Sequence, residues 1–137
     1  MEEERKFQVG PGFTLPELLL PDLVVTAKPV LTLQATYYDT ADLRLARAGA
    51  SLRFRRGDAQ PWTVKLPTEV PGTRREISAR SKPAFPPAEL TALVTALCRS
   101  APLVPVATVG TIRRPYELSQ SDSGVLAELV DDDVNVL

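Results

Sequence analysis

Charged residues recur at every second position in several short parts of the sequence. Glu2, Glu4 and Lys6 form the first such series, and Arg53 and Arg55 form the second. Alternate residues of a β-strand point to the same face of the sheet, with about 6 to 7 Å between them. We therefore expect two carboxylates and an amine to project together from one strand, and two guanidinium groups from another.

Other segments carry charges beside apolar neighbours in the same way. The residues are Lys65, Arg74, Glu76, Arg113, Glu128 and Asp132. Lys and Arg suit phosphate oxygens, Arg through its bidentate fork. Carboxylates would repel a bound phosphate unless a divalent cation stood between them, and oxygen ligands suit Mg²⁺ or Mn²⁺. The pattern predicts a site for a multiply charged phosphate compound and one of these metals.

A sheet with one solvated face would also place charges at alternate positions. This explanation is sufficient for any single strand. Nearly every predicted strand, however, offers charges on one face, with acids opposite bases. That regularity favours a closed barrel with a polar interior over an ordinary sandwich.

The composition excludes several other kinds of chemistry. The chain has no histidine and one cysteine, Cys98, which excludes Ser-His-Asp triads, Cys-His dyads and the usual zinc sites. Cys98 falls in an apolar helical pattern, so we interpret it as a core residue. The net charge of −1 offers no basic field of the kind that binds duplex nucleic acid.

The length and hydropathy predict one cytoplasmic domain covering residues 1–137. No apolar run approaches the roughly 20 residues that span a bilayer, so no membrane contact is expected. The first residues are acidic, so neither a signal peptide nor a transit peptide is expected.

Turn-forming residues cut the chain into short pieces rich in β-forming residues. Thirteen prolines and seven glycines are present, and hairpin-like turns between the pieces favour antiparallel neighbours. The expected strands are Glu2–Val9, Val30–Tyr38, Ser51–Arg56, Trp62–Leu66, Arg74–Ala79, Ala107–Arg114, Pro115–Ser119 and Val125–Val136. The predicted fold is mainly β.

Two segments carry helix start signals. Thr14 is a capping residue followed by Pro16 and Glu17, and Pro86–Glu89 precedes apolar residues at helical spacing. A further helical turn is expected after Asp39-Thr40.

The charged residues lie within motifs that follow one another in a fixed order. The motifs are Glu2–Lys6 (E-x-E-x-K), Tyr37–Thr40 (Y-Y-D-T), Gly49–Arg55 (G-x-x-L-R-x-R), Trp62–Pro67 (W-x-x-K-L-P), Arg74–Glu76 (R-x-E) and the acidic segment Ala127–Asp132. In this order the chain resembles the CYTH superfamily, also called triphosphate tunnel metalloenzymes, from residue 2 to its end.

The resemblance implies an antiparallel eight-stranded β-barrel, or tunnel, with a few flanking helices. It implies substrate-binding roles for Lys6, Arg53, Arg55, Lys65, Arg74 and Arg113. It implies metal ligation by Glu2, Glu4, Glu128 and Asp132, and catalytic roles for Lys6 and Glu76.

Strand register leaves three of these choices open. Arg75 competes with Arg74, and Arg114 competes with Arg113. Asp131 and Asp133 both compete with Asp132.

The implied function is hydrolysis of an inorganic or organic triphosphate with Mg²⁺ or Mn²⁺. One alternative is a module that binds polyphosphate or a nucleotide without turnover, and another is an adenylate cyclase. The segment Trp62–Pro67 also resembles bacterial members that precede a CHAD domain, a helical module linked to polyphosphate, which implies a CHAD-type partner domain. The family normally closes with a further acidic strand and a C-terminal helix, and we expect both to be missing from a chain that ends at Leu137.

Overall fold

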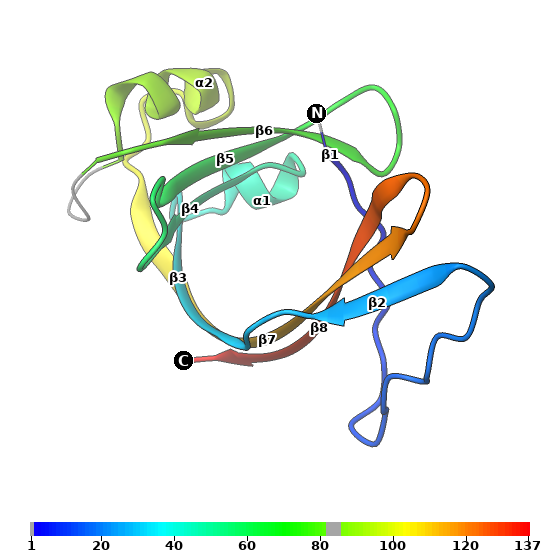
Figure 1. Cartoon of the computed structure of the whole chain (residues 1–137). Helices are drawn as coiled ribbons and strands as arrows, with labels where there is room; N and C mark the ends of the chain where they lie inside the picture. The colour runs from blue at the N-terminus through cyan, green and yellow to red at the C-terminus, as the bar shows by residue number, and fades with distance from the viewer. Residues whose placement is uncertain (1, 82–85) are drawn as a thin grey trace. The chain divides into compact units, whose positions relative to one another are not determined.

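The chain folds into strands joined mostly by short turns. In the computed structural model, residues 2–81 and 86–137 are described, and for Glu2 the backbone alone. Within these residues there are eight strands and two helices (Figure 1). Each strand pair whose register is given is antiparallel. The prediction of a mainly β, antiparallel fold with a few helices is confirmed.

The chain divides into two compact units. The first consists of Met1–Lys6, Gln34–Val109 and Val136–Leu137, and the second of Phe7–Leu33 and Gly110–Asn135. Strands β3 (Leu31–Asp39) and β7 (Val104–Gln120) each contribute residues to both.

The first unit is built on a sheet with the strand order β1-β6-β5-β4-β3. Its other strands are β1 (Glu2–Glu3), β4 (Ser51–Arg55), β5 (Trp62–Pro67) and β6 (Thr73–Ala79). The turn between β5 and β6 contains Gly72 at φ 79°, a left-handed conformation that glycine adopts without steric cost. Short turns of this kind fix the register of neighbouring strands.

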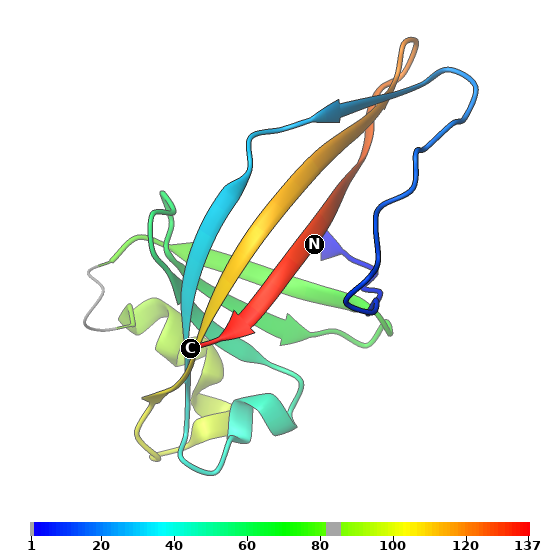
Figure 2. The same ribbon diagram turned by 90° about the horizontal axis from the view of Figure 1, so that it is seen from below.

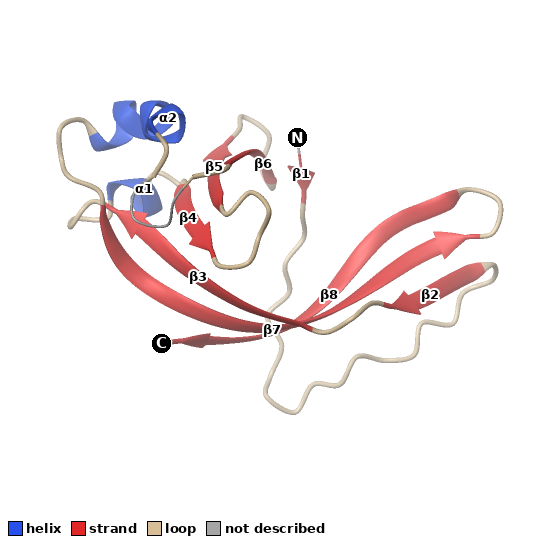
Figure 3. Ribbon diagram, turned by 60° about the vertical axis from the view of Figure 1, so that its left-hand side comes forward, coloured by secondary structure: helices blue, strands red, loops and turns tan. Residues whose placement is uncertain are grey.

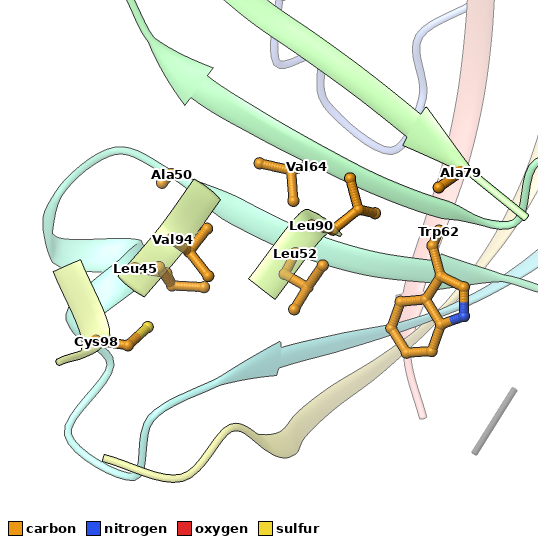
Figure 4. Packing of buried hydrophobic residues seen from close by; sticks show 9 residues of the cluster. All are labelled: Leu45, Ala50, Leu52, Trp62, Val64, Ala79, Leu90, Val94 and Cys98. Atoms are coloured by element: carbon orange, nitrogen blue, oxygen red, sulfur yellow. The ribbon is translucent and has the colours of Figure 1, made fainter. Parts of the chain in front are cut away.

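One face of this sheet packs against both helices to form the core. Helix α1 (Arg44–Arg47) contacts β4, and helix α2 (Ala88–Cys98) contacts both α1 and β6 (Figure 3). The buried hydrophobic cluster, drawn in Figure 4, consists of Leu45, Ala50, Leu52, Trp62, Val64, Ala79, Leu90, Val94 and Cys98. Burial of this apolar surface is the main stabilising contribution to the unit.

Helix α2 confirms the prediction made from Pro86–Glu89. Its buried residues Leu90, Val94 and Cys98 recur every four positions, which places them on one face of the helix. Burial raises the pKa of the Cys98 thiol above its ordinary value. The thiol therefore stays protonated and packs as a small apolar group.

Helix α1 follows Asp39-Thr40, where a helical turn was expected. The buried Asp39 carboxylate accepts hydrogen bonds from the N–H groups of Leu45 at 2.9 Å and Ala46 at 3.0 Å. It also accepts one from Thr40 N–H at 2.7 Å. A short helix has little stability of its own, so this carboxylate is a main determinant of the turn.

Replacing Asp39 by asparagine is expected to lower the free energy of unfolding by about 1.5 to 3 kcal/mol, because charge-assisted bonds to backbone N–H groups are lost. Urea denaturation followed by circular dichroism measures the change. Asp122→Asn, in an exposed turn, is the control and should leave stability unchanged. Equal stability of the two variants would contradict the capping role.

The second unit is a three-stranded arrangement around β7. Strands β2 (Leu23–Ala27) and β8 (Gly124–Val136) both pair with β7 (Figure 2). The buried hydrophobic core residues all belong to the first unit, whereas Val24, Val25, Val125 and Leu126 of the second unit are exposed.

Three predictions about elements were wrong. The predicted strand Glu2–Val9 ends at Glu3, because Glu3 lies opposite Thr73, where β6 begins, and later residues have no partner there. The two strands predicted on either side of the Arg114–Pro115 bond are one strand, β7. Proline lacks only the N–H donor, and the Pro115 carbonyl still accepts a hydrogen bond from Lys28 N–H at 2.9 Å.

The helix predicted at Thr14 is also absent, since residues 13–20, all of them described, contain none. Residues that precede a proline avoid the helical region, so Pro16 and Pro21 leave less than two turns between them. The next segment, β2, was not predicted at all. Its sequence Leu-Val-Val-Thr-Ala nevertheless carries the β-branched signal of a strand.

Candidate functional site

The sheet face of the first unit that lies opposite the core carries five of the predicted site residues, Arg53, Arg55, Lys65, Arg74 and Glu76. Antiparallel register aligns them in rows across the strands. One row is Tyr37, Arg53, Thr63 and Ser78, the next is Ser51, Lys65 and Glu76, and a third is Pro67, Arg74 and Glu2. We call the side chains of the rows, together with Arg55, the polar face; the side chain of Glu2 lies outside the described part of the chain.

Lys65 lies between the carboxylate of Glu76 on the polar face and the carboxylate of Glu4 in the N-terminal segment. Its Nζ is 3.3 Å from Glu76 Oε2 and 3.8 Å from Glu4 Oε2. Glu4 Oε1 is also 3.7 Å from Lys6 Nζ. The Lys65 side chain is 19% exposed, whereas that of Lys6 is 77% exposed. Lys65 is therefore the more buried cation of the two, and it contacts both Glu4 and Glu76.

The two arginines of β4 lie on the same face and are partly buried. Arg55 forms an ion pair with Asp58 at 3.7 Å. Arg53 Nε is buried and has no hydrogen-bond partner among residues 2–81 and 86–137. A buried donor without a partner is uncommon in folded proteins, and an anionic acceptor above Arg53 would satisfy it.

Two adjoining pockets cover this region. The small pocket, about 140 Å³, is lined by Lys6, Tyr37, Ser51, Arg53, Thr63, Lys65 and Arg74. The large pocket, about 380 Å³, is lined by Glu4, Lys6, Gly49, Lys65, Arg74 and the segment from Pro67 to Thr73 apart from Glu69. The two pockets share Lys6, Lys65 and Arg74, so positive charge is concentrated where they meet.

The remaining predicted site residues belong to the second unit. The Arg113 guanidinium donates two hydrogen bonds to Asp132, from Nε to Oδ1 at 2.9 Å and from Nη2 to Oδ2 at 2.8 Å. Glu128 is exposed, four residues before Asp132 on the same strand. The predicted phosphate ligand Arg113 and the predicted metal ligand Asp132 thus bind each other in this structure.

A model of the CYTH domain matches residues 1–137. The chain belongs to the CYTH domain family. Two uncharacterized proteins, from two strains of Mycobacterium tuberculosis, are each 37% identical to it over 139 residues, which cover 98% of this chain and 27% of theirs. This CYTH domain therefore spans about a quarter of the length of the curated relatives it matches.

CYTH domains bind triphosphates and generally depend on a divalent metal. In this CYTH domain, Glu4 and Glu76 are two acids of the described site that both contact Lys65. No group of three or more acidic, histidine or cysteine side chains comes together within the described residues. Two carboxylates still fit a metal such as Mg²⁺, which commonly takes one or two from the protein and the rest of its ligands from phosphates and water.

The sequence left three choices open between neighbouring residues, and the structure shows on which face of the sheet each residue lies. Arg74 lines both pockets, whereas Arg75 lies opposite Leu66 on the other face of the sheet. Alternation along β7 and β8 places Arg114, Asp131 and Asp133 away from the face on which Arg113 contacts Asp132.

Sequence reasoning chose none of the hydroxyl groups of the small pocket as site residues. They belong to Tyr37, Ser51 and Thr63, and Thr63 Oγ1 lies 3.1 Å from Ser78 Oγ. The signal was present, because Ser51 precedes Arg53 by two residues and Thr63 precedes Lys65 by two. The turn between β5 and β6, which lines the large pocket, has no comparable alternation in its sequence.

No helix among the described residues is long and apolar enough to cross a membrane.

Proposed function

We propose that this CYTH domain binds a triphosphate on the polar face of the first unit and hydrolyses its terminal anhydride bond with Mg²⁺ or Mn²⁺. The observation that carries the proposal is the position of Lys65 between Glu4 and Glu76, beside two pockets lined with further cations. Cations and carboxylates in one site suit a ligand that is a metal–phosphate complex.

The phosphate chain would bind to the cations of the two pockets. Lys6, Lys65 and Arg74 line both, and Arg53 lines the small one. Arg53 Nε is available to a phosphate oxygen, and Arg binds such oxygens with directed N–H groups where Lys acts as a mobile point charge. The hydroxyls of Ser51 and Thr63 add neutral donors beside these charges.

Glu4 and Glu76 are the described residues that would hold the metal. Their carboxylate oxygens are suitable ligands for Mg²⁺ or Mn²⁺. Glu2, two residues before Glu4, is one of the further ligands that the sequence predicts, together with Glu128 and Asp132 of the second unit. When bound, the metal supplies charge neutralisation on the phosphate oxygens and polarisation of the terminal phosphoryl group.

The protein's own part in hydrolysis is positioning and charge stabilisation. Water attacks the terminal phosphorus, the bond to the bridging oxygen breaks, and orthophosphate and the shortened phosphate are released. Lys6 would stabilise the charge that develops on the transferred group, and Lys65 would hold the adjacent phosphate. Glu76 would accept a hydrogen bond from the attacking water and orient it.

Removal of both carboxylates tests the assignment. Glu4→Gln with Glu76→Gln is expected to lower metal-dependent phosphate release from inorganic triphosphate by at least about 100-fold, as loss of metal support does elsewhere. The matched control is Glu117→Gln, since Glu117 forms a comparable ion pair with Lys28 at 3.4 Å in the second unit. Undiminished release by the double variant would refute the proposal.

One observation favours binding without turnover as a second candidate. Glu4 already contacts two lysines, and Glu76 contacts one, so both acids have partners without a metal. In that case triphosphate, polyphosphate or a nucleotide would raise the melting temperature of the protein while no phosphate is released. Measuring both quantities in the same samples separates the two functions.

The partner domain and the cellular location are further predictions from the sequence. The relatives are much longer than the matched region, and a CHAD-type partner domain would belong to such a longer protein. A cytoplasmic location is likewise a prediction from the sequence.

A further inference from the structure

The two helices of the first unit carry three arginines that are separate from the proposed phosphate site. Arg44 and Arg47 belong to α1, and Arg99 directly follows α2, which packs against α1. All three line two adjoining pockets of about 390 and 310 Å³, and both pockets also contain Leu97. None of the three lines the pockets of the polar face. We call Arg44, Arg47 and Arg99 the arginine cluster.

The arginine cluster has more positive charge than its surroundings neutralise. Asp42 Oδ2 lies 3.1 Å from Arg44 Nε and 3.3 Å from Arg47 Nη2. Hydrogen bonds from the Thr40 hydroxyl and from Arg44 lower the pKa of Asp42, so this carboxylate stays ionised. Among the residues that the structure describes, Arg99 has no ion-pair partner. One carboxylate and three guanidinium groups line the two pockets, so two positive charges remain in excess.

The backbone at Arg99 adopts a conformation that usually requires glycine. Its φ of 55° and ψ of −127° lie in a region that residues with a Cβ atom rarely enter. Strained residues of this kind cluster at functional sites, where the surrounding structure maintains the strain. Here the conformation ends α2 and places the Arg99 side chain in the lining of both pockets. Arg44 fixes the same point, because its Nη1 donates a hydrogen bond to the Cys98 carbonyl at 2.8 Å.

The other residues that line the two pockets are apolar. They are Ala48, Ala96 and Leu97. The first N–H groups of α1 cannot hold a small anion, because they already donate to Asp39 and Thr40. An inorganic anion would therefore contact guanidinium groups alone and leave Leu97 uncovered. An occupant that carries both carboxylates and an apolar side chain would use the whole lining.

We propose that the arginine cluster docks an acidic peptide segment of a partner protein, with carboxylates on the guanidinium groups and an apolar side chain on Leu97. Arginine is enriched at protein–protein contacts and binds carboxylates through its planar fork. Leu93, one helical turn before Leu97 and 41% exposed, extends the apolar surface along α2. An anionic membrane suits this surface less well, because lipid-binding clusters commonly have about four to eight cations.

The test begins with a random peptide library displayed on phage and selected on the wild-type domain. Enriched sequences are expected to combine Asp or Glu with an apolar residue. The Kd of the best synthetic peptide is then measured by fluorescence anisotropy. Arg99→Gly removes one guanidinium group at a position whose φ suits glycine, so the variant should fold normally. It is expected to bind the peptide about threefold to tenfold more weakly, and addition of Arg47→Gln should extend the loss to about 10-fold to 100-fold.

Two control variants locate the binding. Arg56→Gln changes an exposed arginine that lines neither pocket of the cluster, and Lys65→Met changes the polar face. Both should keep the peptide Kd of the wild type, and Arg99→Gly should keep the Kd of the wild type for inorganic triphosphate. Docking at the cluster is thus tested separately from the phosphate site. Peptide binding that weakens in Lys65→Met but not in Arg99→Gly overturns the proposal.

Three further results would also overturn it. The first is a selection that enriches no acidic sequence on the wild type. The second is equal binding after serine replaces the apolar residues of the peptide, together with competition by inorganic phosphate, which would indicate a simple anion site. The third is binding to phosphatidylserine vesicles that depends on Arg99 and exceeds binding to every selected peptide, which would indicate a membrane surface.

Discussion

Replacing Lys65 by methionine is expected to weaken binding of inorganic triphosphate about 10-fold to 100-fold, the equivalent of one charge-assisted hydrogen bond in a partly buried site. Lys65 is one of the three cations that both pockets share, and it contacts both Glu4 and Glu76. Its loss removes one phosphate contact and also leaves two carboxylates without their common counter-charge. Isothermal calorimetry in Mg²⁺ measures the change in Kd.

The lost phosphate contact and the carboxylate repulsion can be separated by replacing the two glutamates with neutral glutamine. If carboxylate repulsion contributes, Lys65→Met combined with Glu4→Gln and Glu76→Gln should bind triphosphate more tightly in metal-free buffer than Lys65→Met alone. Lys28→Met is the matched control, since Lys28 has a single carboxylate partner, Glu117, at 3.4 Å. An unchanged Kd in Lys65→Met would show that Lys65 does not contribute to triphosphate binding.

The sequence predicted the first unit well because its strands are neighbours in the chain. β4, β5 and β6 follow one another through short turns, so alternation within each strand was enough to place Arg53, Lys65 and Glu76 on one face. Local rules also sufficed for α2, where start signals and apolar spacing agree.

The rest of the site depended on register between distant segments. The length of β1 is set by where β6 begins, more than sixty residues away, and nothing near Glu2 encodes it. Arg113 and Asp132 were predicted to bind different groups, a phosphate and a metal. Their bidentate contact comes from the pairing of β7 with β8, which alternation along either strand alone does not specify.

Replacing Trp62 by alanine is expected to lower the free energy of unfolding by about 3 to 5 kcal/mol, as for other large core aromatics. Trp62 is fully buried in the core cluster, and its ring lies 5.1 Å from those of both Tyr38 and Phe54. Alanine would leave a cavity between strands β3, β4 and β5 that rigid sheet neighbours cannot fill.

Urea denaturation followed by far-UV circular dichroism measures this loss without relying on the tryptophan signal. Phe7→Ala is the control, because Phe7 is 83% exposed and its truncation should cost less than about 0.5 kcal/mol. A loss below about 1 kcal/mol in Trp62→Ala would contradict the packing of the core. Trp62 and Lys65 lie on opposite faces of the same strand, so the variant also tests whether the core alone holds the polar face in shape. If it does, triphosphate binding at low temperature should weaken in Trp62→Ala although every cation of the site is retained.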